Sequence, residues 1–438
     1  MRWHSRGVQN KLMIQAVLVY GMTIQSHIAE GAPTVRHYSS SGPCAASDAL
    51  APEFLLTAAC CRWPATEARN VAVRNAAAGV TDWNHFLWLV RRQRVAGLVH
   101  DALLAAGIDL PSATAKKLGA WAARITRQNS VLAAETVRLQ RALKAADIPV
   151  LVLKGVALAQ LAYCSLGAKH ARDIDLLVPP ERAETAMRLL EREGYILASP
   201  AQHLSDRQRH SVVRYAREVE LVHPDSHLIV ELQWRAMDNS LLLQGVDAHS
   251  VAQSVPLSDG ATVHTLGQED LFAYLCVHGA HHAWSRLKWL ADVNALVAND
   301  ADFGRLYRHA QRIGAGLCAG QGLLLCQRLF ALNLPEPLVD ELGANQRVKK
   351  LMTIALDAMT APRAETEADG GVAGVMRIVR TQFLLGQGWA FYAAQIRAMA
   401  AGPADVIRFP LPMPLHFLYP LLRLPLWLWR RSTSAHGR

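Results

Sequence analysis

Hydrophobic and polar positions divide the chain into two helical segments with a segment of short strands between them. From residue 51 to residue 146, apolar residues recur at three- and four-residue spacing, which is the period of an α-helix. Thr81 and Asp82 are good N-cap residues for a helix that begins at Trp83. A longer helix is predicted from Ser112 to Lys144, in one piece or two. Residues 51–146 are therefore expected to form an N-terminal helical unit.

Short apolar runs replace the helical period after residue 146. Runs rich in β-branched residues predict strands, and amphipathic stretches between them predict helices. The predicted strands are 149–153, 173–178, 219–223 and 228–234, and the predicted helices are 156–163 and 181–193. This order, closed by a hairpin, predicts a compact α/β core with a mixed sheet over residues 147–266.

The helical pattern returns at Gln268. It runs to about Leu356, gives way to Ala-, Glu- and Gly-rich sequence at 360–374 that is expected to be a loop, and continues to about Ala401. A C-terminal helical domain is therefore predicted over residues 267–400. Together with the mixed sheet, these helical units predict an α+β fold.

Both ends of the chain differ from the body. Residues 1–50 are predicted to be a disordered leader, although the apolar run from Leu12 to Ile24 after a basic start is the feature that would instead indicate a signal peptide. Residues 401–438 form a basic tail rich in Pro, Leu and Trp, and its prolines argue against a transmembrane helix. We expect the tail to pack on the body, with a peripheral membrane contact as the alternative.

The net charge of +10 at pH 7 raises the question of a nucleic-acid partner. The first 50 residues carry +2 and the last 16 carry +4, so the body of the chain carries only +4. A charge on the tails is weaker evidence than a basic body. A nucleic-acid partner is therefore not expected.

The seven cysteines are scattered along the chain, and no two of them form a C-x-x-C pair. An odd number of scattered cysteines favours reduced thiols over a disulfide framework or a zinc site. The protein is therefore expected to be cytoplasmic. Hydrophobic residues make up 51% of the sequence, which is enough for two or three packed units.

Asp173 and Asp175 are the first candidates for chemistry. Side chains alternate between the faces of a strand, so these two carboxylates share one face, roughly 7 Å apart along the chain. Two neighbouring carboxylates repel each other. Mg²⁺ relieves that repulsion, because it binds oxygen ligands and keeps positions open for substrate phosphates. Solvated acids at the end of a strand are the alternative.

Glu231 is the third candidate carboxylate. It lies in a strongly apolar predicted strand, on the face opposite to Val230 and Leu232. A lone carboxylate in such a strand needs a partner or a metal. The alternative is a glutamate at the edge of a sheet that pairs with an arginine or a lysine.

Lys154 and Gly155 lie where the first predicted strand of the core meets the following helix. Glycine allows the backbone to approach a ligand closely. The N-terminus of the helix offers free N–H groups and a positive dipole to a phosphate, and Lys154 adds a charge. An ordinary turn is the alternative.

In this order, the three features resemble the polymerase-beta-like nucleotidyltransferases, and most closely a subgroup of uncharacterised bacterial nucleotidyltransferases with an L-K-G turn. The matching segments are V-L-K-G at 152–155, R-D-I-D-L-L-V at 172–178, V-E-L-Q-W at 230–234, L-C-V-H-G-A-H-H-A-W at 275–284 and L-K-W-L-A-D-V at 287–293. The resemblance covers roughly residues 50–400.

The resemblance implies a metal-dependent nucleotidyltransferase that uses Mg²⁺ or Mn²⁺, takes an NTP as donor and modifies an unidentified acceptor. Asp173, Asp175 and Glu231 would be the catalytic, metal-binding carboxylates. The residues expected to bind the nucleotide are Lys154, Gly155, Lys169 and Arg172.

The sequence departs from the family pattern at four places. Lys154 precedes the glycine where the wider superfamily has a Gly-Ser or Gly-Gly turn. In the subgroup, Lys169 replaces the usual Arg, Gln233 the usual His, and Glu231 the commoner Asp. These departures leave the expected fold intact and bear on the rate of the reaction.

His278, His282 and Asp292 belong to the helical part of the resemblance. The histidines are four residues apart and so lie on one helix face, and Asp292 follows His278 by fourteen residues, close to four turns, which puts it on nearly the same face. We expect them to line the nucleotide or acceptor site. A buried structural His–Asp network is the alternative. A zinc pair is a further one, but it lacks a third ligand.

Two other functions stay open at this point. A catalytically weak or inactive protein could keep the fold as a scaffold in a biosynthetic assembly. A nucleic-acid-binding protein would account for the charge. Binding of both a nucleotide and Mg²⁺ would favour the enzyme, and an affinity that falls steeply with salt would favour nucleic-acid binding.

Overall fold

The computed structural model describes residues 50–257, 260–298, 302–361, 371–400 and 403–409, together with 411, 415, 418, 419 and 422. The predicted leader lies outside this range except for Leu50, as does most of the predicted tail. The first described helices are α2 (Pro52–Cys60), α3 (Glu67–Ala77), α4 (Trp83–Gln93), α5 (Ala96–Ala105) and α6 (Ser112–Ala145).

The predicted helix start at Trp83 is confirmed. The side chain of Asp82 accepts hydrogen bonds from the backbone N–H groups of Asn84 at 2.9 Å and His85 at 3.0 Å. These bonds satisfy two of the N–H groups that a helix leaves unpaired at its N-terminus. The helix predicted from Ser112 is a single helix of 34 residues, α6.

The central segment contains the predicted strands and helices and several more elements. Its elements are β1 (Leu151–Val152), α7 (Val156–Tyr163), β2 (Ile174–Leu177), the 3₁₀-helix η1 (Pro180–Arg182), α8 (Ala183–Arg192), β3 (Ile196–Ser199), α9 (Asp206–Tyr215), β4 (Glu218–Val222), β5 (Ile229–Gln233), β6 (Ala252–Pro256) and β7 (Thr262–Leu266). Strands β3, β6 and β7 and helix α9 are additions to the sequence prediction. Helix α9 is mostly polar, and it begins at a capping box formed by Ser205 and Gln208.

Five of these strands form one mixed sheet in the order β1-β2-β5-β4-β3. Strands β2 and β5 are parallel, whereas the other three neighbouring pairs are antiparallel. Strands β6 and β7 form a separate antiparallel hairpin. The predicted mixed sheet is therefore confirmed. β5 lies at its centre, so Glu231 is not at a sheet edge.

The two faces of the sheet have different surroundings. On one face, Ile174, Leu176, Val230 and Leu232 are buried in a core that they share with residues of α6 and α8. Alternation along the strands places Asp175 and Glu231 on the other face. The charges of Asp175 and Glu231 act on the buried hydroxyl of Tyr274, so this face is turned towards α10.

Helices follow the sheet to the end of the described chain. They are α10 (Gln268–His281), α11 (Leu287–Val297), α12 (Phe303–Arg312), α13 (Gly316–Phe330), α14 (Glu336–Ala344), α15 (Gln346–Thr360), α16 (Gly371–Leu384), α17 (Gly388–Ala400) and α18 (Pro403–Arg408). The loop expected at 360–374 falls largely on residues outside the described ranges, and α16 begins within it. None of the described helices has the length and apolar character needed to cross a membrane.

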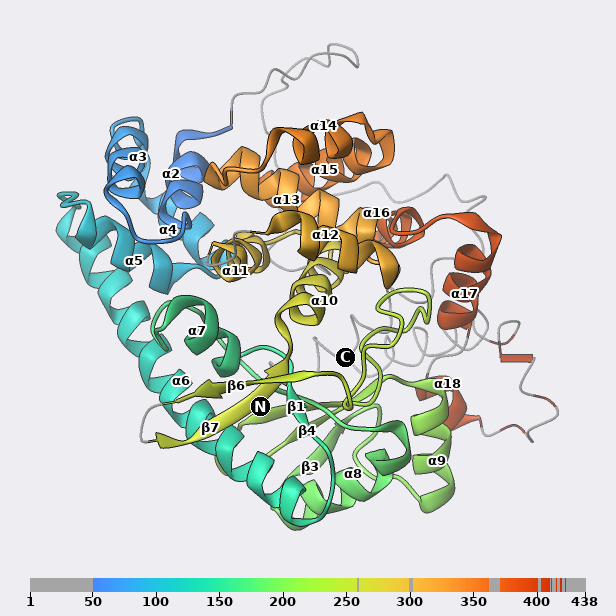
Figure 1. Ribbon diagram of the computed structural model, residues 1–438. Coiled ribbons are helices and arrows are strands. Elements are labelled where there is room, and N and C mark those ends of the chain that lie inside the picture. The colour runs from blue at the N-terminus through green and yellow to red at the C-terminus, as the bar shows by residue number, and fades with distance from the viewer. Residues whose placement is uncertain are drawn as a thin grey trace, which may run out of the picture.

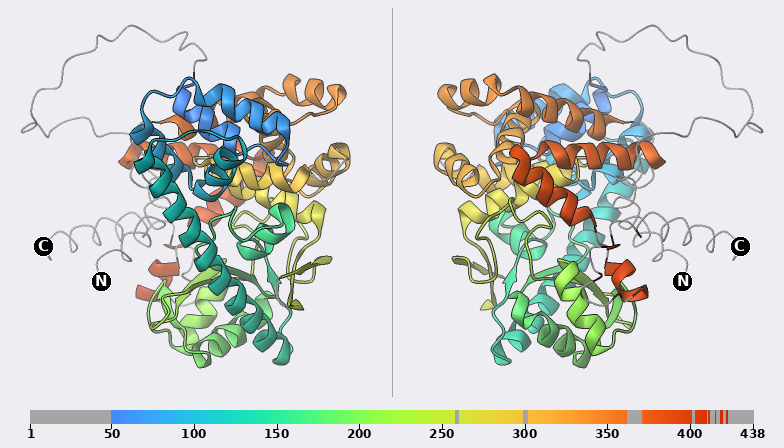
Figure 2. Two further views of the ribbon diagram at one scale, coloured as in Figure 1. Left: turned by 90° about the vertical axis from the view of Figure 1, so that its left-hand side faces the viewer. Right: turned by 90° about the vertical axis from the view of Figure 1, so that its right-hand side faces the viewer.

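Helices from both ends of the chain pack into one hydrophobic core. Phe54 and Phe86 from the N-terminal helices share this core with Trp284, Leu325 and Leu351 from the C-terminal helices. Figure 1 shows the result: α2–α5 lie beside α11, α13 and α15, while the sheet and α8 occupy the opposite end of the molecule. In the side views of Figure 2, α6 runs along the molecule from the helical end to the sheet end. The α+β fold predicted from the sequence is confirmed.

Candidate active site

The carboxylates of Asp175 and Glu231 lie side by side on neighbouring strands. Asp175 of β2 is directly opposite Glu231 of β5 in the parallel register, so both side chains point to the same face. The ammonium of Lys154 forms an ion pair with Asp175, and its Nζ lies 3.8 Å from Oε2 of Glu231. The structure therefore brings two of the three predicted carboxylates together around a lysine.

The turn at Lys154 and Gly155 holds this lysine in place. Leu153 N–H donates to the carbonyl oxygen of Asp175 at 3.1 Å, which ties the end of β1 to β2. Gly155 has φ +66°, a conformation that favours glycine, and a Cβ there would lie 3.4 Å from the carbonyl oxygen of Asp173. The turn thus lies directly against β2 and the residue before it, the segment that carries the two aspartates.

Asp175 has a second partner and one unpaired oxygen. Gln233 Nε2 donates to Oδ1 of Asp175 at 3.2 Å. The side chain of Asp175 is fully buried, and its Oδ2 has no hydrogen-bond partner among the described residues. A buried carboxylate oxygen without a partner costs free energy, which makes it a ready ligand for a cation.

Asp173, Asp175, Glu231 and Lys154 act on one another electrostatically, and we call them the carboxylate cluster. Burial raises the pKa of Asp175 well above its ordinary value, and the charges of Asp173 and Glu231 add to this effect. Burial by itself lowers the pKa of Lys154, but the carboxylates, Asp175 foremost, outweigh it and raise that pKa. The cluster therefore has more negative charge than Lys154 alone can compensate.

The donor atoms of this cluster fit a divalent cation. Oxygen ligands from Asp173, Asp175 and Glu231 are the kind that Mg²⁺ and Mn²⁺ prefer, and Oδ2 of Asp175 has a free bonding capacity. Within the described part of the chain, no three Asp, Glu, His or Cys side chains are already arranged around a common point as metal ligands. In its present position Lys154 supplies the positive charge, so a metal would have to compete with its ammonium.

Helix α10 covers the carboxylates from the helical side. Tyr274 and His278 lie one turn apart with their rings stacked, 6.0 Å between centroids. The hydroxyl of Tyr274 is buried without a partner among the described residues. Burial and the charge of Lys154 lower the pKa of His278 well below its ordinary value, so its imidazole is neutral at pH 7. His278 thus lines the carboxylate cluster.

His282 and Asp292 have different surroundings. The ring of His282 is 4.9 Å from that of His278 and stacks on Trp289 at 4.9 Å. Asp292 accepts a hydrogen bond from Tyr163 Oη at 3.1 Å and forms an ion pair with Lys169. The buried network around Asp292 therefore contains a lysine and a tyrosine in place of the two histidines.

The predicted nucleotide-binding residues fall into two groups. Lys154 and Gly155 lie against the carboxylates, and Arg172 is exposed beside Asp173. Lys169 is buried, and its ammonium is held by Asp292 of α11. The ion pair of Lys169 connects the loop before β2 to the C-terminal helices.

Tyr274, Gln233 and Arg217 belong to the surroundings of the cluster, although the sequence analysis did not select them as site residues. The charges of Asp175 and Glu231 help to raise the pKa of Tyr274, and the charge of Glu231 helps to raise that of Arg217. The alternation of β5 contained a signal for Gln233, because a residue two positions after Glu231 shares its face. Tyr274 had a weaker signal, since it lies one helical turn before His278.

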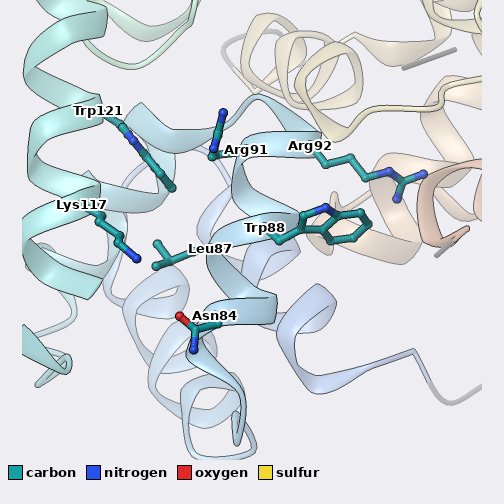
Figure 3. A pocket seen from close by; sticks show the side chains of 7 residues that line it. All are labelled: Asn84, Leu87, Trp88, Arg91, Arg92, Lys117 and Trp121. Atoms are coloured by element: carbon teal, nitrogen blue, oxygen red, sulfur yellow. The ribbon is translucent and has the colours of Figure 1, made fainter. Parts of the chain in front are cut away.

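A separate groove of about 430 Å³ lies between α4 and α6 (Figure 3). The guanidinium of Arg91 lies over the ring of Trp121, and that of Arg92 over Trp88. The residues that line the groove are Asn84, Leu87, Trp88, Arg91, Arg92, Lys117 and Trp121. None of the carboxylates or lysines described above is among them, so the groove is distinct from the carboxylate cluster.

Comparison with protein families places this chain in a known group. The sequence pattern of the family described as "Uncharacterised nucleotidyltransferase" matches residues 79–331, more than half of the chain. The matched region extends from the residues before α4 to the end of α13 and so includes every residue of the carboxylate cluster. A search of curated proteins finds no match. The family match agrees with the resemblance drawn from the sequence motifs, and the chain belongs to this uncharacterised nucleotidyltransferase family.

Proposed function

We propose that the protein transfers a nucleoside monophosphate from an NTP to a hydroxyl group of an acceptor, with Asp173, Asp175 and Glu231 as ligands of Mg²⁺ or Mn²⁺. The observation that carries this proposal is the cluster itself. Two carboxylates lie on adjacent parallel strands, and one of them has a buried oxygen without a partner among the described residues. When bound, the divalent cation would polarise the α-phosphate and help to neutralise the departing pyrophosphate.

The turn at Gly155 would bind phosphate oxygens of the nucleotide. Helix α7 begins immediately after this glycine, and its first N–H groups have no partners within the helix. Lys154 precedes the turn and is paired with Asp175. When a nucleotide and its cation bind, the ammonium would exchange Asp175 for a phosphate. In the empty site Lys154 would balance the charge of the carboxylates, and in the occupied site it would bind a phosphate.

The reaction also requires a group that accepts a proton. The oxygen of the acceptor hydroxyl forms a bond to the α-phosphorus and loses its proton, while the bond from phosphorus to the bridging oxygen breaks. Glu231 is more exposed than Asp175 and can help to remove this proton. His278 also lines the cluster, but its strongly lowered pKa makes its imidazole a weak base, so Glu231 is the candidate.

An inactive scaffold is the second candidate function, and Lys154 is the observation that favours it. Its ammonium already compensates part of the charge of Asp175 and Glu231. In a scaffold, this ion pair would keep the fold intact without a metal or a nucleotide. The enzyme and the scaffold therefore differ in whether a divalent cation displaces Lys154.

Calorimetry with Mg²⁺ and each of the four NTPs tests this difference. The enzyme is expected to bind an NTP in the presence of Mg²⁺, and the Asp173→Asn, Asp175→Asn double variant is expected to lose that binding. A mass-spectrometric screen for nucleotidylated products would then identify the acceptor. If the wild type binds none of the four nucleotides, the scaffold function replaces the enzyme. If the acceptor is a nucleic acid, the affinity of the protein for it should fall steeply as the salt concentration rises.

We also propose that the reaction takes place in the cytoplasm. The support for this location is that all six cysteines in the described part of the chain are free thiols. Five of them are buried, and only Cys164 is exposed.

A further inference from the structure

The groove between α4 and α6 combines two kinds of side chain that bind small molecules. Among the described residues, its lining contains two indoles and three cations but no aspartate or glutamate: Trp88, Trp121, Arg91, Arg92 and Lys117. α4 and the first part of α6 lie at the helical end of the molecule, away from the sheet (Figure 1). The groove therefore needs an explanation separate from that of the carboxylate cluster.

The spacing of residues along the two helices produces this lining. On α4, the lining residues recur at the three- and four-residue steps of one helix face: Asn84, Leu87, Trp88 and Arg91. On α6, Lys117 lies one turn before Trp121. Leu87 of α4 and Leu118 of α6 are buried in the same hydrophobic core. The groove thus lies between two helices whose positions this core fixes.

Arg92 and Trp88 form a structural side of the groove. The buried guanidinium of Arg92 donates to the backbone oxygens of Met359 at 2.6 Å and Ala358 at 3.0 Å. It also lies 5.5 Å from the centre of the Trp88 ring. Because its donors already have acceptors in α15, Arg92 joins two helices, and we assign it no ligand.

Arg91, Lys117 and Trp121 form the open side of the groove. The two cations are exposed, and Trp121 is half-buried. The guanidinium of Arg91 lies 5.6 Å from the centre of the Trp121 ring, and Figure 3 shows Lys117 and Trp121 reaching from α6 towards Leu87 and Arg91 of α4. Neither cation forms an ion pair within the described part of the chain, so both can pair with an anion.

Exposed cations alone do not define a site, because water and salt ions solvate them. Here they lie beside an indole in a groove of about 430 Å³, and sites for small molecules usually measure roughly 300–1,000 Å³. Guanidinium, ammonium and indole N–H groups are hydrogen-bond donors, and Asn84 alone offers a side-chain acceptor in the described lining. Such a lining favours a ligand with negative charge and several acceptors, and an indole favours a flat ring.

We propose that this groove binds a small organic anion in which a flat ring carries a phosphate or a carboxylate, as in nucleoside monophosphates and aromatic acids. The anionic group would lie between Arg91 and Lys117, and the ring would lie along the apolar surface of Trp121 and Leu87. This second ligand site does not depend on the proposed function, because none of its residues belongs to the carboxylate cluster.

Titration calorimetry on the full chain, without divalent cations, tests the class of ligand. AMP is the probe for the phosphate and 4-hydroxybenzoate the probe for the carboxylate, and one of them is expected to bind. Removal of either half should weaken binding by roughly 10-fold or more. Adenosine and phenol lack the anionic group, and ribose 5-phosphate and acetate lack the flat ring. The proposal is overturned if neither probe binds, or if a compound without the ring binds as well as its probe.

Substitutions in the groove test its residues. Arg91→Gln and Lys117→Gln are each expected to weaken binding by roughly 10-fold, since each removes a charge-assisted contact. Lys116→Gln is the matched control, because Lys116 is the exposed neighbour of Lys117 on α6 and does not line the groove, and it should change the affinity by less than about twofold. Unchanged melting temperatures would show that the variants are folded. Wild-type affinity in both groove variants would overturn the assignment.

Two further measurements locate the bound probe. The Asp173→Asn, Asp175→Asn double variant should bind the probe as the wild type does, and a loss of binding would place the probe at the carboxylate cluster instead. A single-stranded oligonucleotide that binds far more tightly than AMP would make the groove part of a nucleic-acid site, since each further base and phosphate adds contacts. Either result overturns the small-ligand site. If no NTP binds with Mg²⁺ but the probe still depends on Arg91 and Lys117, the groove stands and the nucleotidyl transfer does not.

Discussion

Gln233 of β5 donates a hydrogen bond to Asp175 of β2 across the two parallel strands at the centre of the sheet. Both side chains are buried, so this bond to a carboxylate is shielded from water. It holds Oδ1 of Asp175 in a fixed direction, and Oδ2 is the oxygen left for a cation. An amide thus positions the carboxylate that we propose as a metal ligand.

Gln233→Leu should weaken metal binding more than it changes the fold. The substitution removes one hydrogen bond to a charged group, worth about 1.5–3 kcal/mol, but it also removes the buried amide oxygen of Gln233, which has no partner among the described residues. Urea unfolding should therefore show a loss of less than about 3 kcal/mol, and Mn²⁺ titration should show a lower affinity. An unchanged Mn²⁺ affinity would contradict a positioning role. Gln233→His, the residue of the related subgroup, should restore binding.

The double variant Asp173→Asn, Asp175→Asn should lose the stabilisation that a ligand of the native state provides. At 100 times its Kd, a ligand stabilises the native state by about 2.7 kcal/mol. Melting curves with and without Mg²⁺ and each NTP are expected to shift for the wild type and to stay unchanged for the variant. Without ligands, the variant should be less stable than the wild type, because the largely buried ammonium of Lys154 loses its partner Asp175. A wild type whose melting temperature does not shift with any ligand would instead indicate a purely structural role for the aspartates.

Lys154→Met should increase the affinity for divalent cations. The ammonium competes for Asp175 and Glu231, so its removal is expected to tighten Mn²⁺ binding by roughly 10-fold, or about 1.4 kcal/mol. The same variant should melt earlier without metal, since buried carboxylates then lack a counter-charge. Calorimetry and melting curves measure the two effects. Weaker Mn²⁺ binding would mean that Lys154 supports the metal site rather than competing with it.

Lys169→Met should affect stability and leave nucleotide affinity nearly unchanged. Lys169 and Asp292 are a buried ion pair, and removal of one partner costs about 3–5 kcal/mol. The double variant Lys169→Met, Asp292→Leu should recover a large part of that loss, as measured by urea unfolding. If the purified Lys169→Met protein is stable but binds NTP much more weakly, the lysine contacts the nucleotide directly.

The pKa of His170 should rise when an NTP binds beside Arg172. Burial and the surrounding cations lower this pKa to about 4, and an anion among them opposes their effect, so the value should move towards 6.5. NMR of labelled histidine ring protons as a function of pH measures the change. His264 serves as the control, because its pKa is lowered by burial and Lys144 and not by the cations around His170. Without a ligand, the folded protein protonates His170 only at a lower pH than the unfolded chain does. The free energy of unfolding should therefore decrease as pH falls from about 6.5 towards 4.

The local parts of the site could be predicted from the sequence, because they depend on the spacing of apolar residues within one strand or helix. The apolar pattern predicted α7 at its observed limits, and alternation along β5 placed Glu231 on the face opposite to Val230 and Leu232. That Asp173 shares the face of Asp175 stays a prediction, because Asp173 precedes β2. The register between β2 and β5 and the ion pair of Lys154 could not be predicted, since they depend on contacts between distant residues. The same holds for the hydrogen bond from Leu287 to Gln93, which joins the start of α11 to the end of α4.

The sequence pattern did not predict the elements that have few apolar residues. Helix α9 has many charged residues, and β3 and β6 are short and partly polar, so neither the helical nor the strand period is strong there. Tertiary packing and the cap at Ser205 determine their structure. For Asp292, the fourteen-residue spacing from His278 assumed one continuous helix, whereas the chain turns between α10 and α11.

The packing of α4 on α15 has a consequence for synthesis on the ribosome. Arg92 donates to the backbone oxygen of Met359 at 2.6 Å, and Gln93 donates to the same oxygen at 2.9 Å. These partners are separated by 267 and 266 residues, so at about 5–20 residues per second the N-terminal helices wait roughly tens of seconds for them. The sheet core is complete by β7 and can fold earlier. During that interval the nascent chain would expose the apolar faces of α2–α5, which makes it a natural client for chaperones that bind such surfaces.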